Sequence, residues 1–306
     1  MGVRPHDRLS VLELPTPLVR AASLSTAGRD AFLKNETVLP TGSFKVRGAL
    51  HALRACLARQ PIGEVIAAST GNHGAAVAWA ARSAGVGATI FVPEHSNPLK
   101  VARIRELGAQ LVETGADLSA ATDAAYAYAE RTGAFFLHDA ADPDVPAGTA
   151  QIGEEIIAQQ PAVTRIYVPM GDTALIRGVA SAARRAKPSV TIVGVAAANA
   201  PAYLLSWQQG RVVETETALT IADGLAVRRP LMQNVTAIRA LVDEVQAVTE
   251  AEMLAAIAHL RREEAITAEP AGAAAVAAYL KDGSASAVNV LLVTGANIAP
   301  AVAARV

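Results

Sequence analysis

The 306-residue chain has little of several features that define whole classes of protein. Cys56 is its only cysteine, so no disulfide can form within the chain and an oxidising compartment is not indicated. Aromatic residues make up only 4%, so the chain offers no obvious surface on which bases could stack. The formal net charge is −1, so there is no excess of positive charge that would attract nucleic acid. We therefore expect no nucleic-acid partner.

Long hydrophobic runs are also missing. No apolar segment reaches the ~20 uninterrupted residues of a membrane-spanning helix. Residues 1–7 contain no apolar run of the signal-peptide type. We therefore expect no membrane partner and a cytoplasmic location. The chain has no HExxH motif and no Cys/His cluster, so we expect no metal site.

The remaining composition, 52% hydrophobic and 18% charged, fits a compact α/β enzyme. Short apolar runs alternate with helical patterns between residues 61 and 145, and a second such series begins at residue 165. This alternation predicts parallel βαβ units with helices on both faces of each sheet. We expect an α/β protein of two doubly wound lobes: a large domain of residues 1–60 and 146–306, and a small domain of residues 61–145.

Lysine is scarce in this chain, and one lysine opens a predicted helix. Only five of the 27 basic residues are lysines. Pro40 and Gly42 interrupt regular structure, whereas the apolar spacing from Val46 to Arg59 predicts a helix. Lys45 therefore lies at a helix start, where backbone N–H groups favour anions and disfavour a second positive charge. A partly buried amine in that place is suited to attack an aldehyde.

The stretch from Thr41 to Ala49, with residues 33–36 before it, resembles a segment of a known family. It is similar to the cofactor-lysine segment of the serine/threonine dehydratases, which are tryptophan-synthase-β-like, fold type II pyridoxal-phosphate enzymes. The resemblance runs from about Pro15 to Asn297. It implies that Lys45 carries pyridoxal 5′-phosphate as a Schiff base and that Phe44 belongs to the cofactor site.

A second motif lies between a predicted strand and a predicted helix. Its glycines allow close backbone approach, and N–H groups at the helix start can hold a carboxylate. By resemblance this loop binds the carboxylate of an amino acid substrate, and Asn72 also binds the phenolic oxygen of the cofactor. Thr70 stands where related serine racemases carry a serine acid/base, which disfavours racemisation. The expected substrate residues are Ser69, Thr70, Gly71, Asn72 and His73.

A third motif departs from the family pattern. Relatives carry a run of glycines that holds the cofactor phosphate, and only one glycine of that run is present here. A carboxylate at position 172 would repel the phosphate unless it points away, whereas a threonine hydroxyl can donate a hydrogen bond. We expect a rearranged phosphate site, or a weakened one, formed by Gly171, Asp172, Thr173, Ala174 and Leu175.

The fourth motif follows the last predicted strand. By resemblance Thr294 is the hydroxyl partner of the pyridine nitrogen, and such a neutral partner suits β-elimination. The resemblance thus implies a lyase that converts a small hydroxy amino acid, such as L-threonine or L-serine, to a 2-oxo acid and ammonia. Lys45 would act as general base, and the enzyme would be a homodimer.

Three alternatives remain open at this level. One is an amino acid racemase of the same fold, and another is a catalytically impaired relative that binds pyridoxal phosphate through the altered loop. A nicotinamide-dependent oxidoreductase shares the α/β class. The last is disfavoured because no Gly-x-Gly-x-x-Gly follows a strand and opens a helix.

Overall fold

The structure, a computed structural model, describes residues 12–96, 98–283 and 287–306. The expectation that residues 1–7 hold no signal peptide falls outside these residues. The chain forms two compact units. We call unit 1 the part that contains Lys45–Gly148, and unit 2 the part made of Glu13–Phe44 and Thr149–Val306.

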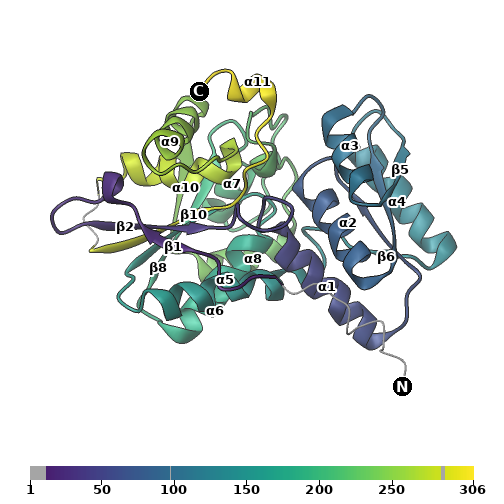
Figure 1. The fold of residues 1–306 in the computed structure, drawn as a ribbon, viewed down its shortest axis with the longest axis horizontal. Helices are drawn as coiled ribbons and strands as arrows, with labels where there is room; N and C mark the ends of the chain where they lie inside the picture. Colours follow the sequence, from purple (N-terminus) through teal and green to yellow (C-terminus); the bar gives the residue numbers. More distant parts are fainter. Residues whose placement is uncertain (1–11, 97, 284–286) are drawn as a thin grey trace. The chain divides into compact units, whose positions relative to one another are not determined.

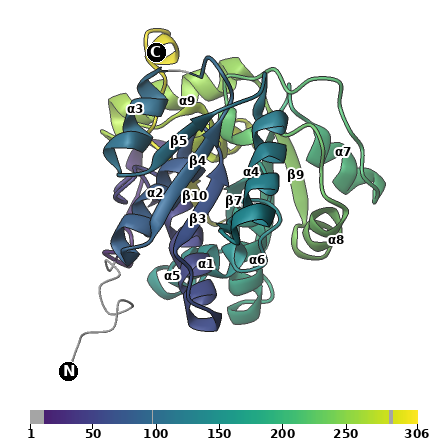
Figure 2. The ribbon, with the colours of Figure 1, turned by 90° about the vertical axis from the view of Figure 1, so that its right-hand side faces the viewer.

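Unit 1 is built on a four-stranded parallel sheet in the order β5-β4-β3-β6 (Figures 1 and 2). Its strands are β3 (Glu64–Ala68), β4 (Gly87–Val92), β5 (Gln110–Glu113) and β6 (Phe135–Phe136). Its helices are α1 (Lys45–Arg59), α2 (Asn72–Ala84), α3 (Pro98–Glu106) and α4 (Leu118–Thr132).

Helices cover both faces of the unit 1 sheet. Ala121 and Ala125 of α4 pack against Ile66 and Phe91 on one face. Helix α2 covers the other face, and α1 packs on α2. Helix α4 begins where the Asp117 carboxylate accepts a hydrogen bond from an N–H of its first turn, which is a standard N-cap. Unit 1 is therefore a parallel βαβ sheet with helices on both faces, which is the architecture that the alternating pattern of the sequence predicts.

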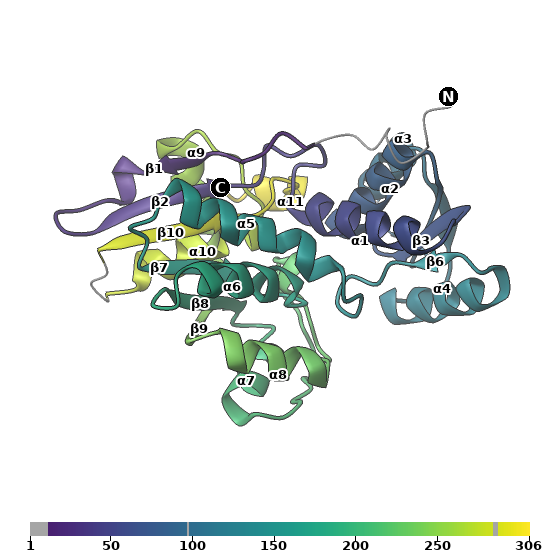
Figure 3. The ribbon, with the colours of Figure 1, turned by 90° about the horizontal axis from the view of Figure 1, so that it is seen from below.

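Unit 2 contains a six-stranded sheet in the order β1-β2-β10-β7-β8-β9, which Figure 3 shows from β2 to β9. All neighbouring strands are parallel except β1 and β2, which are antiparallel. The strands are β1 (Leu18–Arg20), β2 (Asp30–Asn35), β7 (Arg165–Pro169), β8 (Thr191–Ala197), β9 (Glu244–Val248) and β10 (Val288–Val293).

The central strands of unit 2 bury both of their faces. On β8, Val193 and Val195 belong to the cluster that α9 and α10 cover, whereas Ile192 and Ala196 belong to the cluster on the opposite face. The helices in chain order are α5 (Val145–Gln159), α6 (Ala174–Ala186), α7 (Ala202–Gln209), α8 (Met232–Leu241), α9 (Glu250–Glu263), α10 (Pro270–Lys281) and α11 (Pro300–Ala303). Two short 3₁₀ helices are η2 (Ala22–Leu24) and η3 (Asp223–Leu225).

The predicted α/β architecture is confirmed, but the two units divide the chain differently from the expected domains. We expected residues 46–60 in the large domain, whereas α1 belongs to unit 1. The physical reason is that α1 buries its apolar side, including Leu50 and Leu53, while it packs on α2. Among the described residues, no helix has the length and apolar content to cross a membrane.

A buried polar network connects strands β7 and β9 with the end of α10. Asp282 accepts hydrogen bonds from Tyr167 (2.6 Å), Gln246 (3.1 Å) and Arg165 (3.2 Å), and Arg165 also pairs with Glu244. Burial, followed by the hydrogen bond to Asp282, raises the pKa of Tyr167. Asp282 is thus the shared acceptor of two buried donors, Arg165 and Tyr167, and of the partly buried Gln246.

We predict that Asp282→Ala lowers the free energy of unfolding by about 2–4 kcal/mol, because it leaves buried donors unpaired. Urea unfolding at neutral pH measures this change. Glu214→Ala is the matched control, since Glu214 pairs with Arg229 at the surface; its effect should stay within about 0.5 kcal/mol. Equal effects of the two substitutions would contradict the prediction.

Candidate functional site

Within unit 2, the segment that precedes Lys45 is tied to the loop after β10. The backbone N–H of Phe44 donates to the carbonyl oxygen of Thr294 at 3.0 Å, and the N–H of Ala296 donates to that of Gly42 at 2.9 Å. Two residues assigned to the cofactor, Phe44 and Thr294, are therefore neighbours, although 250 positions separate them in the sequence. Thr294 is buried.

Lys45 is the first residue of α1 and belongs to unit 1, and its side chain is only 12% exposed. Its Nζ lies 2.5 Å from Oδ2 of Asp139. The other carboxylate oxygen of Asp139 lies 3.3 Å from Nδ1 of His73, a residue of the expected substrate loop. The structure thus joins the amine to that loop through a carboxylate to which the sequence analysis assigned no role.

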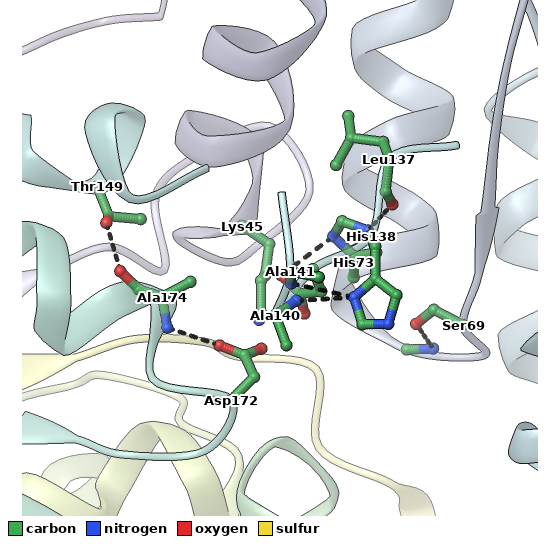
Figure 4. A network of polar contacts seen from close by, with 12 residues as sticks. Lys45, Ser69, His73, Leu137, His138, Ala140, Ala141, Thr149, Asp172 and Ala174 are labelled. Atoms are coloured by element: carbon green, nitrogen blue, oxygen red, sulfur yellow. Dashed lines mark hydrogen bonds and ion pairs between the residues drawn. The ribbon is translucent and has the colours of Figure 1, made fainter. Parts of the chain in front are cut away.

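Asp139 lies in a tight turn after β6. Nδ1 of His138 accepts hydrogen bonds from the N–H groups of Ala140 (3.1 Å) and Ala141 (3.2 Å), as Figure 4 shows. A ring nitrogen that accepts carries no proton. Burial lowers the pKa of His138, and the neighbouring His73 lowers it further, so the neutral ring that this turn needs is favoured.

The expected substrate loop connects β3 to α2. The N–H of Gly71 donates to Oγ of Ser69 at 3.1 Å (Figure 4), and a Cβ at Gly74 would come within 2.5 Å of the Ser69 carbonyl oxygen, so the turn is compact. Among the residues that the structure describes, no side chain caps the start of α2 at Gly71. Ser69, Thr70, Gly71 and Asn72 are partly exposed, whereas His73 is buried. The uncapped helix start suits a carboxylate ligand.

The expected phosphate loop connects β7 to α6. Oδ1 of Asp172 accepts a hydrogen bond from the N–H of Ala174 at 2.9 Å, and the carbonyl oxygen of Ala174 accepts from the Thr149 hydroxyl at 2.9 Å (Figure 4). The Asp172 carboxylate does not point away from the loop. It accepts the hydrogen bond of an N–H group at the helix start, and a bound phosphate would need that same N–H group.

Thr173 has an unusual backbone conformation and a buried hydroxyl, and both suit an anion-binding site. Its φ is +75°, a left-handed conformation that is unusual for a β-branched residue and costs about 1–3 kcal/mol. The residue is 1% exposed, and its hydroxyl has no hydrogen-bond partner in the described part of the chain. Buried hydroxyls normally have a partner, so this one fits a ligand oxygen.

Residues that the sequence analysis left unassigned support the phosphate loop. A Cβ at Gly171 would collide with the Gly224 carbonyl oxygen, so η3 packs directly on the loop. Nδ2 of Asn234 donates to the Asp172 carbonyl oxygen at 3.3 Å and to the Tyr203 hydroxyl at 3.2 Å. Burial raises the pKa of Tyr203 and keeps this hydroxyl neutral.

Comparisons with known proteins agree with this arrangement. The family described as "Pyridoxal-phosphate dependent enzyme" matches residues 9–295. An L-threonine ammonia-lyase of Geobacter sulfurreducens is 39% identical over 295 residues, which are 95% of this chain and 73% of that protein. A solved threonine deaminase of Solanum lycopersicum is 28% identical, with a TM-score of 0.90, 99% of this chain and 84% of that one covered. Maize serine racemase is 28% identical, with a TM-score of 0.89, 95% of this chain and 90% of that one covered.

We predict that Asp172→Asn tightens the binding of pyridoxal phosphate by about tenfold or more, because it removes a negative charge that competes with the phosphate. Titration of the cofactor-free protein gives the dissociation constant. Pyridoxal, which lacks the phosphate, is the control ligand and should bind both proteins equally. Weaker or unchanged binding of pyridoxal phosphate to the variant would show that Asp172 does not compete.

Proposed function

The chain belongs to the family of pyridoxal-phosphate-dependent enzymes, with the fold of type II, and on this basis we propose that it is a lyase of the threonine/serine dehydratase type. It removes the β-hydroxyl of a small amino acid such as L-threonine or L-serine and yields a 2-oxo acid and ammonia. One observation supports this most: unit 1 links the Lys45 amine, through Asp139, to His73 of the substrate loop. The family and the fold class predicted from the sequence are confirmed.

The residues present fit the cofactor. The buried hydroxyl of Thr173, which has no partner among the described residues, suits a phosphate oxygen. By the resemblance, Lys45 of unit 1 would provide the amine for the covalent link and Asn72 the partner of the phenolic oxygen. Thr294 of unit 2 would be the neutral partner of the pyridine nitrogen. When bound, pyridoxal phosphate supplies an electron-withdrawing ring that makes the α-hydrogen of an amino acid acidic.

The protein's own groups have three tasks in this proposal. The loop of residues 69–73 and the start of α2 bind and orient the substrate carboxylate. The Lys45 amine, once released from the cofactor, takes the α-proton as general base. In sum, the α-proton and the β-hydroxyl would leave the amino acid as water, and hydrolysis of the resulting enamine would give the 2-oxo acid and ammonia. The homodimer and the cytoplasmic location expected from the sequence stay predictions.

Racemisation is the second candidate, because maize serine racemase shares the fold over most of this chain. It requires a second acid/base on the face opposite Lys45. Thr70 is the hydroxyl that the sequence offers, and it lies partly exposed in the substrate loop. Formation of the D-amino acid from L-serine would support this candidate.

We predict that Lys45→Ala abolishes both the visible absorption of lysine-bound cofactor and the release of oxo acid from hydroxy amino acids. Spectra of the purified protein before and after borohydride, followed by peptide mass spectrometry, locate the attachment. Lys187→Ala is the matched control, because Lys187 is a surface lysine that hydrogen-bonds the Pro161 carbonyl oxygen.

The control should keep the spectrum and the activity of the unchanged protein. Cofactor attached to a lysine other than Lys45 would contradict the assignment. A loaded protein that converts no hydroxy amino acid would instead point to the impaired cofactor-binding relative.

A further inference from the structure

One carboxylate of unit 1 faces the amine on which the proposed reaction depends. Asp139 lies 2.5 Å from Lys45 Nζ through one oxygen and 3.3 Å from His73 Nδ1 through the other. The side chains are 22%, 12% and 6% exposed for Asp139, Lys45 and His73. Solvent therefore screens this charge pair less than it screens a surface pair.

The place of Asp139 is set by groups other than Lys45. The turn that carries it is closed by the His138 ring, which accepts two backbone N–H groups. Nε2 of His73 lies 2.9 Å from the Leu137 carbonyl oxygen and must carry a proton there, because a carbonyl only accepts. The carboxylate thus lies between His73 of the substrate loop and the Lys45 amine, on a turn that the His138 ring closes.

We propose that Asp139 is a positioning residue for Lys45: it holds the amine where the α-proton is taken and stabilises the ammonium that this transfer creates. This inference rests on the function proposed above. In the step, the lone pair of the neutral Lys45 amine accepts the proton from the substrate α-carbon, and the C–H electron pair stays with the substrate. Asp139 remains a carboxylate throughout and acts by its fixed negative charge.

The same contact has a consequence before any cofactor binds. A carboxylate beside an amine favours the ammonium form, which is opposite to the effect of the helix start on Lys45. An ammonium group does not attack an aldehyde or an acylating reagent, since it has no free lone pair. The reactivity of Lys45 in the cofactor-free protein therefore reports on Asp139 without any turnover.

The first test is competitive acetylation of the cofactor-free protein by limiting acetic anhydride, read by peptide mass spectrometry. In Asp139→Asn, Lys45 should be acetylated about tenfold faster than in the unchanged protein. Lys187 is the internal reference and should react at the same rate in both. Equal rates at Lys45 would overturn the proposal.

Two further variants control for charge and folding. Asp144→Asn removes a carboxylate that pairs with Arg59 at 2.7 Å, and Arg59 ends α1 about 20 Å along the helix from Lys45. It should leave the Lys45 rate unchanged. Asp139→Glu keeps the charge and should keep Lys45 slow. Thermal melting of each variant separates these effects from a loss of folded protein, and fast labelling in the folded Glu variant would contradict a role of charge.

The second test uses the loaded enzyme and a hydroxy amino acid that the unchanged protein converts. Asp139→Asn should lower kcat about tenfold or more and change KM less than about threefold, because the lost interaction forms only as the proton is transferred. A loaded, active enzyme whose kcat survives this substitution would overturn the inference. Absence of cofactor binding by the unchanged protein would instead refute the proposed function, and the acetylation result would still stand.

Discussion

The two backbone hydrogen bonds between residues 42–44 and residues 294–296 are the constraint on which the candidate site depends. They join the segment before Lys45 to the loop after β10, the strand that lies between β2 and β7 in the sheet. Backbone groups make these contacts, so they tolerate many side chains while they determine the path of the chain. Lys45 follows directly, as the first residue of α1. Within unit 2 the path of the chain up to Phe44 is thus fixed at the carboxyl end of β10, and ligands of α/β proteins bind at such strand ends.

Asp139 and Asp172 are two carboxylates that act on groups of opposite charge. Asp139 faces the Lys45 amine and lies beside the His73 ring, so its negative charge acts on the cation that Lys45 forms. Asp172 occupies an N–H group at the start of α6, so it takes a position suited to an anion. The first stabilises a protonated base, and the second competes with a phosphate. Both effects come from charges in places where water screens them incompletely.

Much of the phosphate loop is held by segments that carry no recognisable pattern. Tyr203 and Asn234 come from α7 and α8, where the sequence analysis identified no motif. Strand β9 is a partly exposed edge strand of the sheet and lacks the buried apolar run of the central strands. The left-handed conformation of Thr173 had no signal in the sequence, since such a φ is normally reserved for glycine. In each case tertiary contacts outweigh local preference.

The sequence by itself determined the class of fold, the alternation of strands and helices, and the motifs around Lys45, Asn72 and Thr294. It did so because apolar periodicity and strand-to-helix turns are local properties that a short stretch specifies. Only the tertiary structure decided that α1 belongs with the small sheet and that Asp139 meets Lys45 across 94 positions of sequence. Such contacts depend on how separate elements pack, and no local pattern encodes the distance between two side chains on different elements.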